Sequence, residues 1–329
     1  MNELLIGIDI GGTNLRFALI DRDGKIICRT RTSSCIDQGR DAFCGRLLAG
    51  ISELRSQAHL RGASVAGIGV GVPGLVGSGG LIHASVNMRP LDGFNLSSYL
   101  EEKTGIRAMC GNDANLIALG ECIYGAGRGM KSIIVITVGT GLGSGLVLEG
   151  RLWTGAGGFA SEFGHVTVEP DGLVCPCGNT GCLEQYVSAP AIVRAARTLL
   201  PAGVQAQNGD SLDAAAVATL ARQGESAALA AFHQAGRYLG IAVASLVNTL
   251  NLEAAVIGGG VAASYDLLLP SLRKEVDRRC FTQMSGSFAV MAGELGDDAG
   301  LLGGAALVQT SMDQTRRSIL QTGPSMGSS

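Results

Sequence analysis

The residues best suited to metal chemistry cluster near the middle of the chain. Cys175, Cys177 and Cys182 fall within eight residues, and His165 precedes the first of them by ten positions. Three thiolates and one imidazole form a normal ligand set for structural zinc, and the proline and glycines here favour the tight turns that such a site needs. Four protein ligands leave no open coordination position, so the predicted zinc ion organises structure. The alternative is three free thiols in a loop.

Two carboxylates flank this cluster. Glu162 lies three residues before His165, and Glu184 lies two residues after Cys182. Zinc bound to the cluster would hold both carboxylates near one point, where paired acceptors suit the hydroxyl groups of a sugar. The alternative is a pair of solvated surface glutamates, which is the usual environment of this residue type.

A further carboxylate, Asp113, has a position suited to a catalytic base. The run Asn112–Asn115 follows an apolar strand predicted over residues 106–110 and opens a predicted helix. At the carboxyl end of a strand, Asp113 could accept a proton from a substrate. Asparagine and aspartate are also preferred at helix N-caps, so capping is the alternative role.

Three glycine-rich turns follow predicted strands and could approach phosphate groups. They are the runs Asp9–Asn14, Gly139–Gly141 and Gly258–Gly260. Because glycine has no Cβ, an anion can approach the backbone N–H groups of such turns closely. One such turn alone could be an ordinary hairpin, but three together favour a nucleotide site.

Two better-known nucleotide-binding motifs do not fit this sequence. The segment from Gly125 to Ser132 has Met130 where a Walker A loop requires glycine. The run Gly69–Gly74 matches the glycine pattern of dinucleotide-binding folds. In those folds a helix follows directly and its N-terminus binds the pyrophosphate, but Pro73 and the glycines that follow exclude such a helix here. We interpret this run as a strand end that approaches the substrate.

The elements that must position these residues predict an α/β fold with two related halves. Residues 4–10 and 15–20 form a predicted hairpin, and a similar strand–turn–strand pattern recurs 128 residues later, where Ile136 matches Ile8. This weak repeat suggests duplicated halves. Further elements are a third strand at 25–32 after a turn at Asp23–Gly24, a strand at 65–72, helices at 40–59, 112–124, 189–200, 211–222, 226–250, 265–279 and 298–309, and a polar tail at 310–329.

Composition narrows the class of protein. The 329 residues are 46% hydrophobic and 16% charged, which excludes a disordered chain and leads us to expect two lobes. A net charge of −3 without a basic cluster gives no signal for nucleic acid or a membrane surface. No uninterrupted apolar stretch is long enough to span a membrane. The chain has nine cysteines, which is an odd number, and its N-terminal residues do not resemble a secretory signal. We therefore expect the protein to reside in the reducing cytoplasm.

In this order, the motifs resemble the ROK family of repressors and sugar kinases, within the actin and hexokinase superfamily. Bacterial glucokinases of the family are the most similar, although the run Asn87–Pro90 departs from the Asn-Leu-Pro-Gly-Trp common there. The runs that carry the resemblance are Asp9–Asn14, Gly71–Gly74, Asn112–Asn115, Gly139–Gly143, Glu162–His165, Cys175–Gly178, Gly181–Glu184 and Ile257–Val261.

The resemblance implies ATP-dependent phosphorylation of a hexose 6-hydroxyl, with glucose the expected substrate. Asp113 would be the general base, and His165 would bind both zinc and sugar. Mg²⁺ would lie near Asp9, and Gly259 beside the adenosine. The implied sugar ligands are Asn87, Asn112, Asp113, Glu162, His165 and Glu184, and the implied ATP ligands are Asp9, Gly11, Gly12, Thr13, Asn14, Gly139, Thr140, Gly141 and Gly259.

The resemblance also implies a two-lobed, ribonuclease H-like fold with ATP and sugar in the cleft between the lobes, and a homodimer. We expect residues 1–110 plus 298–329 in a small domain, and 111–297 in a large domain with the zinc loop at 165–184. A DNA-binding repressor is not expected, because Asp9 comes too early for a preceding helix-turn-helix. Fructose, mannose, allose, N-acetylglucosamine and N-acetylmannosamine remain alternative substrates, and a non-catalytic sugar sensor remains an alternative function.

Overall fold

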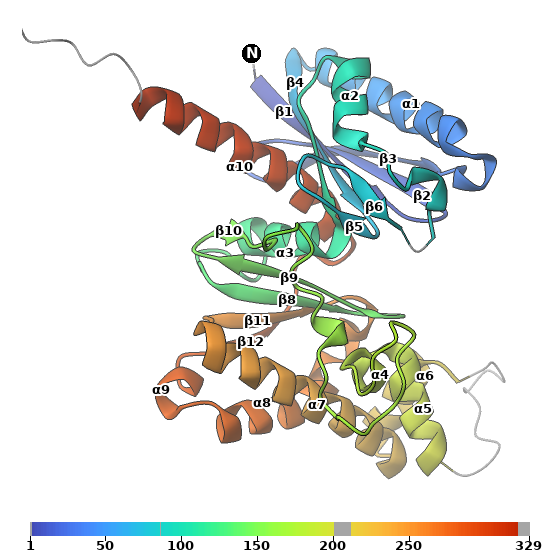
Figure 1. The fold of residues 1–329 in the computed structure, drawn as a ribbon, viewed down its shortest axis with the longest axis vertical. Helices are drawn as coiled ribbons and strands as arrows, with labels where there is room; N and C mark the ends of the chain where they lie inside the picture. Colours follow the sequence, from blue (N-terminus) through green and yellow to red (C-terminus); the bar gives the residue numbers. More distant parts are fainter. Residues whose placement is uncertain (1, 86, 201–211, 322–329) are drawn as a thin grey trace, which may run out of the picture. The chain divides into compact units, whose positions relative to one another are not determined.

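The computed structural model describes residues 2–85, 87–200 and 212–321, which form two compact α/β units (Figure 1). The first contains residues up to Tyr124, Gly155–Phe159 and the chain from Asp297 onward, and the second contains Gly125–Thr154 and Ala160–Gly296. This division differs from the boundary expected after residue 110. The helix that follows, α3 (Asp113–Tyr124), belongs to the first unit because it packs along α10 (Ala299–Gln321).

The first unit is built on a five-stranded sheet in the order β3-β2-β1-β4-β7. The two predicted hairpins are confirmed, since β1 pairs antiparallel with β2 and β2 with β3. The strands β1, β4 and β7 are parallel, so their carboxyl ends meet at one edge. The sheet contains β1 (Asn2–Ile10), β2 (Asn14–Ile20), β3 (Ile26–Ser33), β4 (Ala63–Val72) and β7 (Ala108–Asn112), and β5 (Leu75–Val76) pairs separately with β6 (Ile82–Ala84).

Helices bury apolar faces against this sheet. The predicted amphipathic helix is α1 (Arg40–His59), whose side chains Phe43, Leu47, Ile51 and Leu54 are buried at helical spacing. The shorter α2 (Leu96–Thr104) begins where the side chain of Asn95 accepts a hydrogen bond from the Ser98 N–H, 2.9 Å away, and ends at a left-handed glycine.

Glycines let α10 lie directly on the backbone of its neighbours. A Cβ built on Gly69 of β4 would lie 1.8 Å from the carbonyl oxygen of Gly304, and one on Gly303 would lie 1.8 Å from that of Leu116 in α3. Neither site leaves room for a methyl group. These positions therefore fix how closely α10 approaches β4 and α3.

Replacing Gly303 with alanine should lower the free energy of unfolding by about 3 kcal/mol, because the helices must separate to admit the methyl group. Gly45 in α1 is a matched control, since a Cβ there meets nothing within 4 Å. Gly45→Ala should raise stability by about 0.5–1 kcal/mol through helix propensity. Urea unfolding of both variants measures the difference, and equal effects would contradict the packing argument.

The second unit repeats the topology of the first. Its sheet has the order β10-β9-β8-β11-β12, with β8–β9 and β9–β10 antiparallel and β8, β11 and β12 parallel. Both sheets therefore connect their strands in the same order and directions, which supports the predicted duplication. The strands are β8 (Ile133–Val138), β9 (Leu142–Leu148), β10 (Arg151–Leu152), β11 (Ala254–Gly258) and β12 (Ala289–Ala292).

The helices of the second unit match the predicted helical region closely. The long helix α7 (Ser226–Leu250) and α8 (Tyr265–Arg279) have the predicted bounds, and α6 (Ala214–Arg222) begins after Asp213, which accepts from the Ala216 N–H at 2.7 Å. The predicted start of α6 at Ser211 lies outside the described residues. The remaining helices are α4 (Glu184–Val187), α5 (Ala189–Leu199) and α9 (Thr282–Ser285).

The predicted polar tail is wrong for residues 310–321, because α10 continues to Gln321. Polar contacts support this extension. The guanidinium of Arg107 donates to Ser311 Oγ at 2.7 Å and to Thr315 Oγ1 at 3.4 Å, and Arg22 pairs with Asp313 at 3.5 Å. Residues 322–329 lie outside the described part of the chain. None of the described helices combines the length and apolar content needed to cross a membrane.

Candidate active site

In the first unit, the ends of parallel strands bring the predicted motifs to one edge of the sheet. Asp9 of β1 lies opposite Gly71 of β4, and Val72 lies opposite Asn112 of β7. The Asn112 amide donates to the carbonyl oxygen of Gly74 at 3.0 Å. The run that matches the dinucleotide pattern is therefore a strand end, as predicted, and it supports Asn112.

The Asp9 carboxylate has a cation beside it that the sequence reasoning missed. Arg16 donates to Asp9 Oδ2 from Nε at 2.9 Å and also from Nη2. The first turn of α10 approaches the same carboxylate, since a Cβ on Gly300 would lie 3.3 Å from Asp9 Cγ. Hairpin register contains the signal for Arg16, because residues equidistant from the turn face each other across β1 and β2.

The turn after Asp9 is tied down on both sides. The Gly11 N–H donates to the Asn14 carbonyl oxygen at 2.8 Å, and Ser34 donates from its hydroxyl to the Gly12 carbonyl oxygen at 2.6 Å and from its N–H to that of Thr13 at 2.9 Å. Asn87 is exposed. It lies beside this turn, since a Cβ on Gly12 would be 3.9 Å from Asn87 Cβ. The structure therefore places these predicted ligands in one neighbourhood.

The capping alternative for Asp113 is decided by Asn112. Asn112 Oδ1 accepts from the Asn115 N–H at 3.1 Å, as an N-cap side chain does. Asp113 is then the first residue of α3, half-buried, with Oδ1 accepting from the Ala114 N–H at 2.8 Å. The neighbouring residue Asn112 therefore provides the N-cap of α3.

In the second unit, the β8–β9 turn and the third glycine run lie at the ends of adjacent parallel strands. Gly258 of β11 is opposite Thr137 of β8, and the Gly139 N–H donates to the Gly141 carbonyl oxygen at 2.9 Å. Gly259 has φ +80°, and a Cβ there would lie 2.5 Å from the Val138 carbonyl oxygen. This close approach requires glycine at position 259 and brings that run beside the turn.

The Glu184 carboxylate is bound to the start of β9. Its Oε2 accepts from the Leu142 N–H at 2.8 Å, directly after the Gly139–Gly141 turn. The 3₁₀ helix Phe163–His165 also lies close to Leu142, since a Cβ on Gly164 would be 2.6 Å from the Leu142 carbonyl oxygen. Ala189 also donates its N–H to the Gly139 carbonyl oxygen at 2.8 Å. The segment 184–189, which follows the cysteines, therefore forms hydrogen bonds on both sides of the Gly139–Gly141 turn.

The predicted metal ligands are gathered at one point. The ligand atoms of His165, Cys175, Cys177 and Cys182 lie within 4.8 Å of one another. His165 Nδ1 lies 3.8 Å from Cys175 Sγ, and the Sγ atoms of Cys177 and Cys182 are 3.7 Å apart. A tetrahedral zinc ion with Zn–S bonds of about 2.3 Å separates its sulfur ligands by about 3.8 Å. The donor set and its spacing therefore fit zinc.

Neighbouring groups form hydrogen bonds with the cysteine thiols and shift their pKa values. The Asn179 amide donates to Cys182 Sγ at 3.4 Å and to Thr167 Oγ1 at 3.0 Å, a support that the sequence reasoning missed. The backbone N–H of Asn179 lowers the pKa of Cys177, whereas burial raises the pKa of Cys182 to about 12. Cys182 is therefore protonated at neutral pH unless a cation binds among these ligands.

The predicted residues fall into a group in each unit. Asp9, the turn after it, Asn87, Asn112 and Asp113 belong to the first unit, and the β8–β9 turn, Glu162, His165, Glu184 and Gly259 belong to the second. Glu162 is exposed, and its side chain makes no hydrogen bond or ion pair in the described ranges.

Comparison with known proteins identifies the family. Residues 5–311 match the profile of the ROK family. The chain belongs to the ROK family. A glucokinase of Thermotoga maritima is 34% identical over 316 residues, which cover 93% of this chain and 97% of that protein.

A repressor and a solved glucokinase structure are also similar to the chain. The xylose repressor of Bacillus subtilis is 29% identical over 306 residues, which cover 92% of this chain but 76% of the repressor. Among solved structures, a ROK family glucokinase from Streptomyces griseus in complex with glucose and AMPPNP has a TM-score of 0.74 and 30% identity, covering 93% of this chain and 99% of that one. The actin and hexokinase-like fold expected from the motifs is thereby confirmed.

Proposed function

We propose that this protein is a glucokinase, which transfers the γ-phosphoryl group of ATP to the 6-hydroxyl of glucose. The observation that carries the proposal is the position of Asp113 directly after the carboxyl end of β7, as the first residue of α3, in a chain similar to a glucokinase over 97% of that enzyme. The similar repressor extends well beyond the shared region, whereas the glucokinase does not.

Asp113 is the proposed general base. Its Oδ1 is oriented by the Ala114 N–H, so the carboxylate is held in place to accept the proton of the attacking hydroxyl. Phosphoryl transfer otherwise depends mainly on positioning and charge stabilisation, and Mg²⁺ bound with ATP supplies part of that charge. The turns at Gly11–Asn14 and Gly139–Gly141 offer backbone N–H groups and threonine hydroxyls for the phosphates.

The sugar ligands we propose are Asn87, Asn112, Glu162, His165 and Glu184. Zinc at His165 and the three cysteines would fix the imidazole. Because Nδ1 faces Cys175, zinc on that atom leaves Nε2 to donate to a sugar hydroxyl. The family resemblance further supports a homodimer in the cytoplasm, and sedimentation analysis of the purified protein tests the dimer.

ADP release from Mg-ATP tests the function. The sugars to compare are glucose, mannose, fructose, allose, N-acetylglucosamine and N-acetylmannosamine. Fastest turnover on glucose is the expected result. Faster turnover on another sugar would keep the kinase and replace its substrate, and sugar binding without any turnover would indicate a sensor.

Glu184 should affect both substrates, because it is a proposed sugar ligand and also anchors the glycine turn. Glu184→Ala leaves the Leu142 N–H without its acceptor and should raise KM for ATP and for glucose by about tenfold each. Glu184→Gln keeps an acceptor oxygen, so it should restore KM for ATP while KM for glucose stays raised. Steady-state kinetics of the two variants measure the split, and an unchanged KM for ATP in Glu184→Ala would refute the anchoring role.

A further inference from the structure

A pocket lies in the second unit, on the surface formed by α7 and α8. Its volume is about 420 Å³. None of the residues assigned above to sugar, ATP or zinc contributes to its walls. Every lining side chain is polar or charged: His233, Gln234, Arg237, Ser271, Lys274, Glu275 and Arg278.

Two glycines bring the helices on either side of this pocket unusually close. A Cβ on Gly236 would lie 2.4 Å from the Leu268 carbonyl oxygen, and one on Gly240 would lie 2.6 Å from that of Leu272. With no side chains between them, the backbones are nearly in contact. Basic residues on the two helices therefore lie within reach of one small ligand.

Each helix contributes a pair of basic residues spaced by one turn. His233 and Arg237 are four residues apart on α7, and Lys274 and Arg278 are four apart on α8. Residues with this spacing share a helix face. Lys274 is exposed and makes no ion pair or hydrogen bond with any residue that the structure describes. The pocket thus holds a cation that the protein itself does not neutralise.

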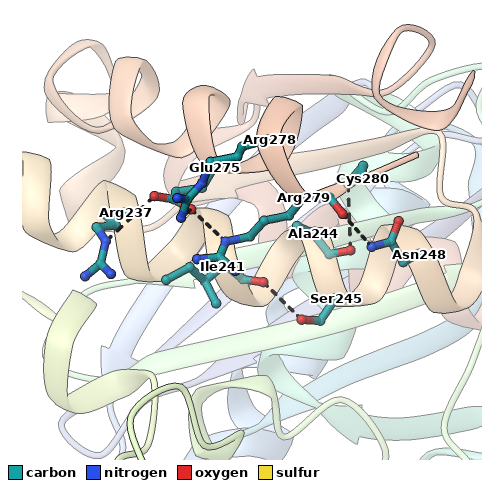
Figure 2. Close-up of polar contacts among 9 residues, drawn as sticks. All are labelled: Arg237, Ile241, Ala244, Ser245, Asn248, Glu275, Arg278, Arg279 and Cys280. Atoms are coloured by element: carbon teal, nitrogen blue, oxygen red, sulfur yellow. Dashed lines mark hydrogen bonds and ion pairs between the residues drawn. The ribbon is translucent and has the colours of Figure 1, made fainter. Parts of the chain in front are cut away.

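A single buried carboxylate organises the arginines. The Glu275 side chain is only 8% exposed and pairs with Arg237 at 3.7 Å, Arg278 at 2.8 Å and Arg279 at 2.6 Å, as Figure 2 shows. Burial alone would raise the pKa of Glu275, but the hydrogen bonds from Arg278 and Arg279 outweigh it and lower the pKa.

The charges around Glu275 do not balance. One carboxylate faces three guanidinium groups, and Lys274 adds a fourth positive charge. The nearby acid Asp277 is already paired with Arg273 at 2.9 Å. Glu275 fixes the arginines in place but leaves an excess of positive charge that a multiply charged anion would neutralise.

We propose that this pocket binds a small phosphate-bearing anion. Arginine and lysine donors from two helices suit the several oxygens of a phosphate group, and Ser271 and Gln234 add neutral donors. The pocket volume accommodates a phosphate group alone or one carried on a sugar. The site is separate from the residues proposed for catalysis, so its ligand would bind in addition to ATP and glucose.

Calorimetric titration tests the proposal, with the protein saturated in glucose so that the proposed sugar ligands are occupied, and the variants separate this pocket from the proposed ATP ligands. The probes are inorganic phosphate, glucose 6-phosphate and a short single-stranded oligonucleotide. Lys274→Gln removes the unpaired cation without breaking a contact. Lys131→Gln is the matched control, because Lys131 is an exposed lysine of the same unit outside the pocket. Kinase assays on the same preparations report separately on the proposed function.

We expect one equivalent of inorganic phosphate or glucose 6-phosphate to bind, with affinity at least about tenfold weaker in Lys274→Gln and unchanged in Lys131→Gln. Binding of both probes would show that the phosphate group suffices, and binding of glucose 6-phosphate alone would show that the sugar contributes. The proposal fails if neither binds, if both variants bind as the wild type does, or if only the oligonucleotide binds.

Discussion

Replacing Asp113 with asparagine should lower kcat by roughly 10²–10⁴, which is the usual contribution of a positioned general base. Asparagine retains an oxygen that can accept from the Ala114 N–H, and Asn112 still caps α3, so the local structure should persist. Glucose affinity should therefore stay within about threefold of wild type. Single-turnover kinetics and equilibrium glucose binding separate the two effects.

Asp41 offers a matched control for this experiment. It also lies in the first turn of a helix in the first unit, and its side chain is exposed. Asp41→Asn removes the same charge from a helix start and should leave kcat unchanged. If Asp113→Asn turned over at the rate of the Asp41 variant, Asp113 would have no part in proton transfer.

Replacing Cys177 with serine should release zinc and raise KM for both substrates. Structural zinc contributes about 10–16 kcal/mol of apparent binding free energy in small zinc domains, so a lost ligand should destabilise the whole loop. Glu184 follows this loop and holds the Leu142 N–H, and Ala189 holds the Gly139 carbonyl oxygen. A disordered loop should therefore loosen the β8–β9 turn, and ATP binding should weaken together with sugar binding.

Elemental analysis for zinc and steady-state kinetics on the same samples check this expectation. Cys28→Ser is the control, because Cys28 is a half-buried cysteine of β3 in the first unit. It should keep full zinc and normal kinetics. Full zinc occupancy in Cys177→Ser would remove that cysteine from the ligand set, and zinc loss with unchanged KM for ATP would disprove the link to the turn.

Local patterns were sufficient to predict most elements. The hairpin at Asp9–Asn14 follows from apolar runs on both sides of a glycine turn, and α7 and α8 follow from their helical periodicity. The cysteine cluster was predictable because its ligands are close in sequence, so short turns alone can gather them. The repeat at an offset of 128 residues was weak in sequence but corresponds to a shared strand order.

What the sequence did not reveal depends on contacts between distant segments. The end of α10 was misplaced because Ser311 and Thr315 are polar, and their partner Arg107 is about 200 positions away. The first unit also extends past the expected boundary after residue 110, because α3 packs on α10. The bond from Leu142 to Glu184 also spans 42 positions, and no periodicity signals it.

The position of α10 in the chain has a consequence for synthesis on the ribosome. The face of β1 and β4 that α10 covers is made before residue 73, but α10 itself begins only at Ala299. At about 5–20 residues per second, the 174 residues between Tyr124 and Ala299 take roughly 9–35 s to translate. During that time the face of the first sheet that contains Gly7 and Gly69 lacks the helix that covers it in the finished protein. The nascent chain therefore presents a surface for chaperones that the finished protein lacks.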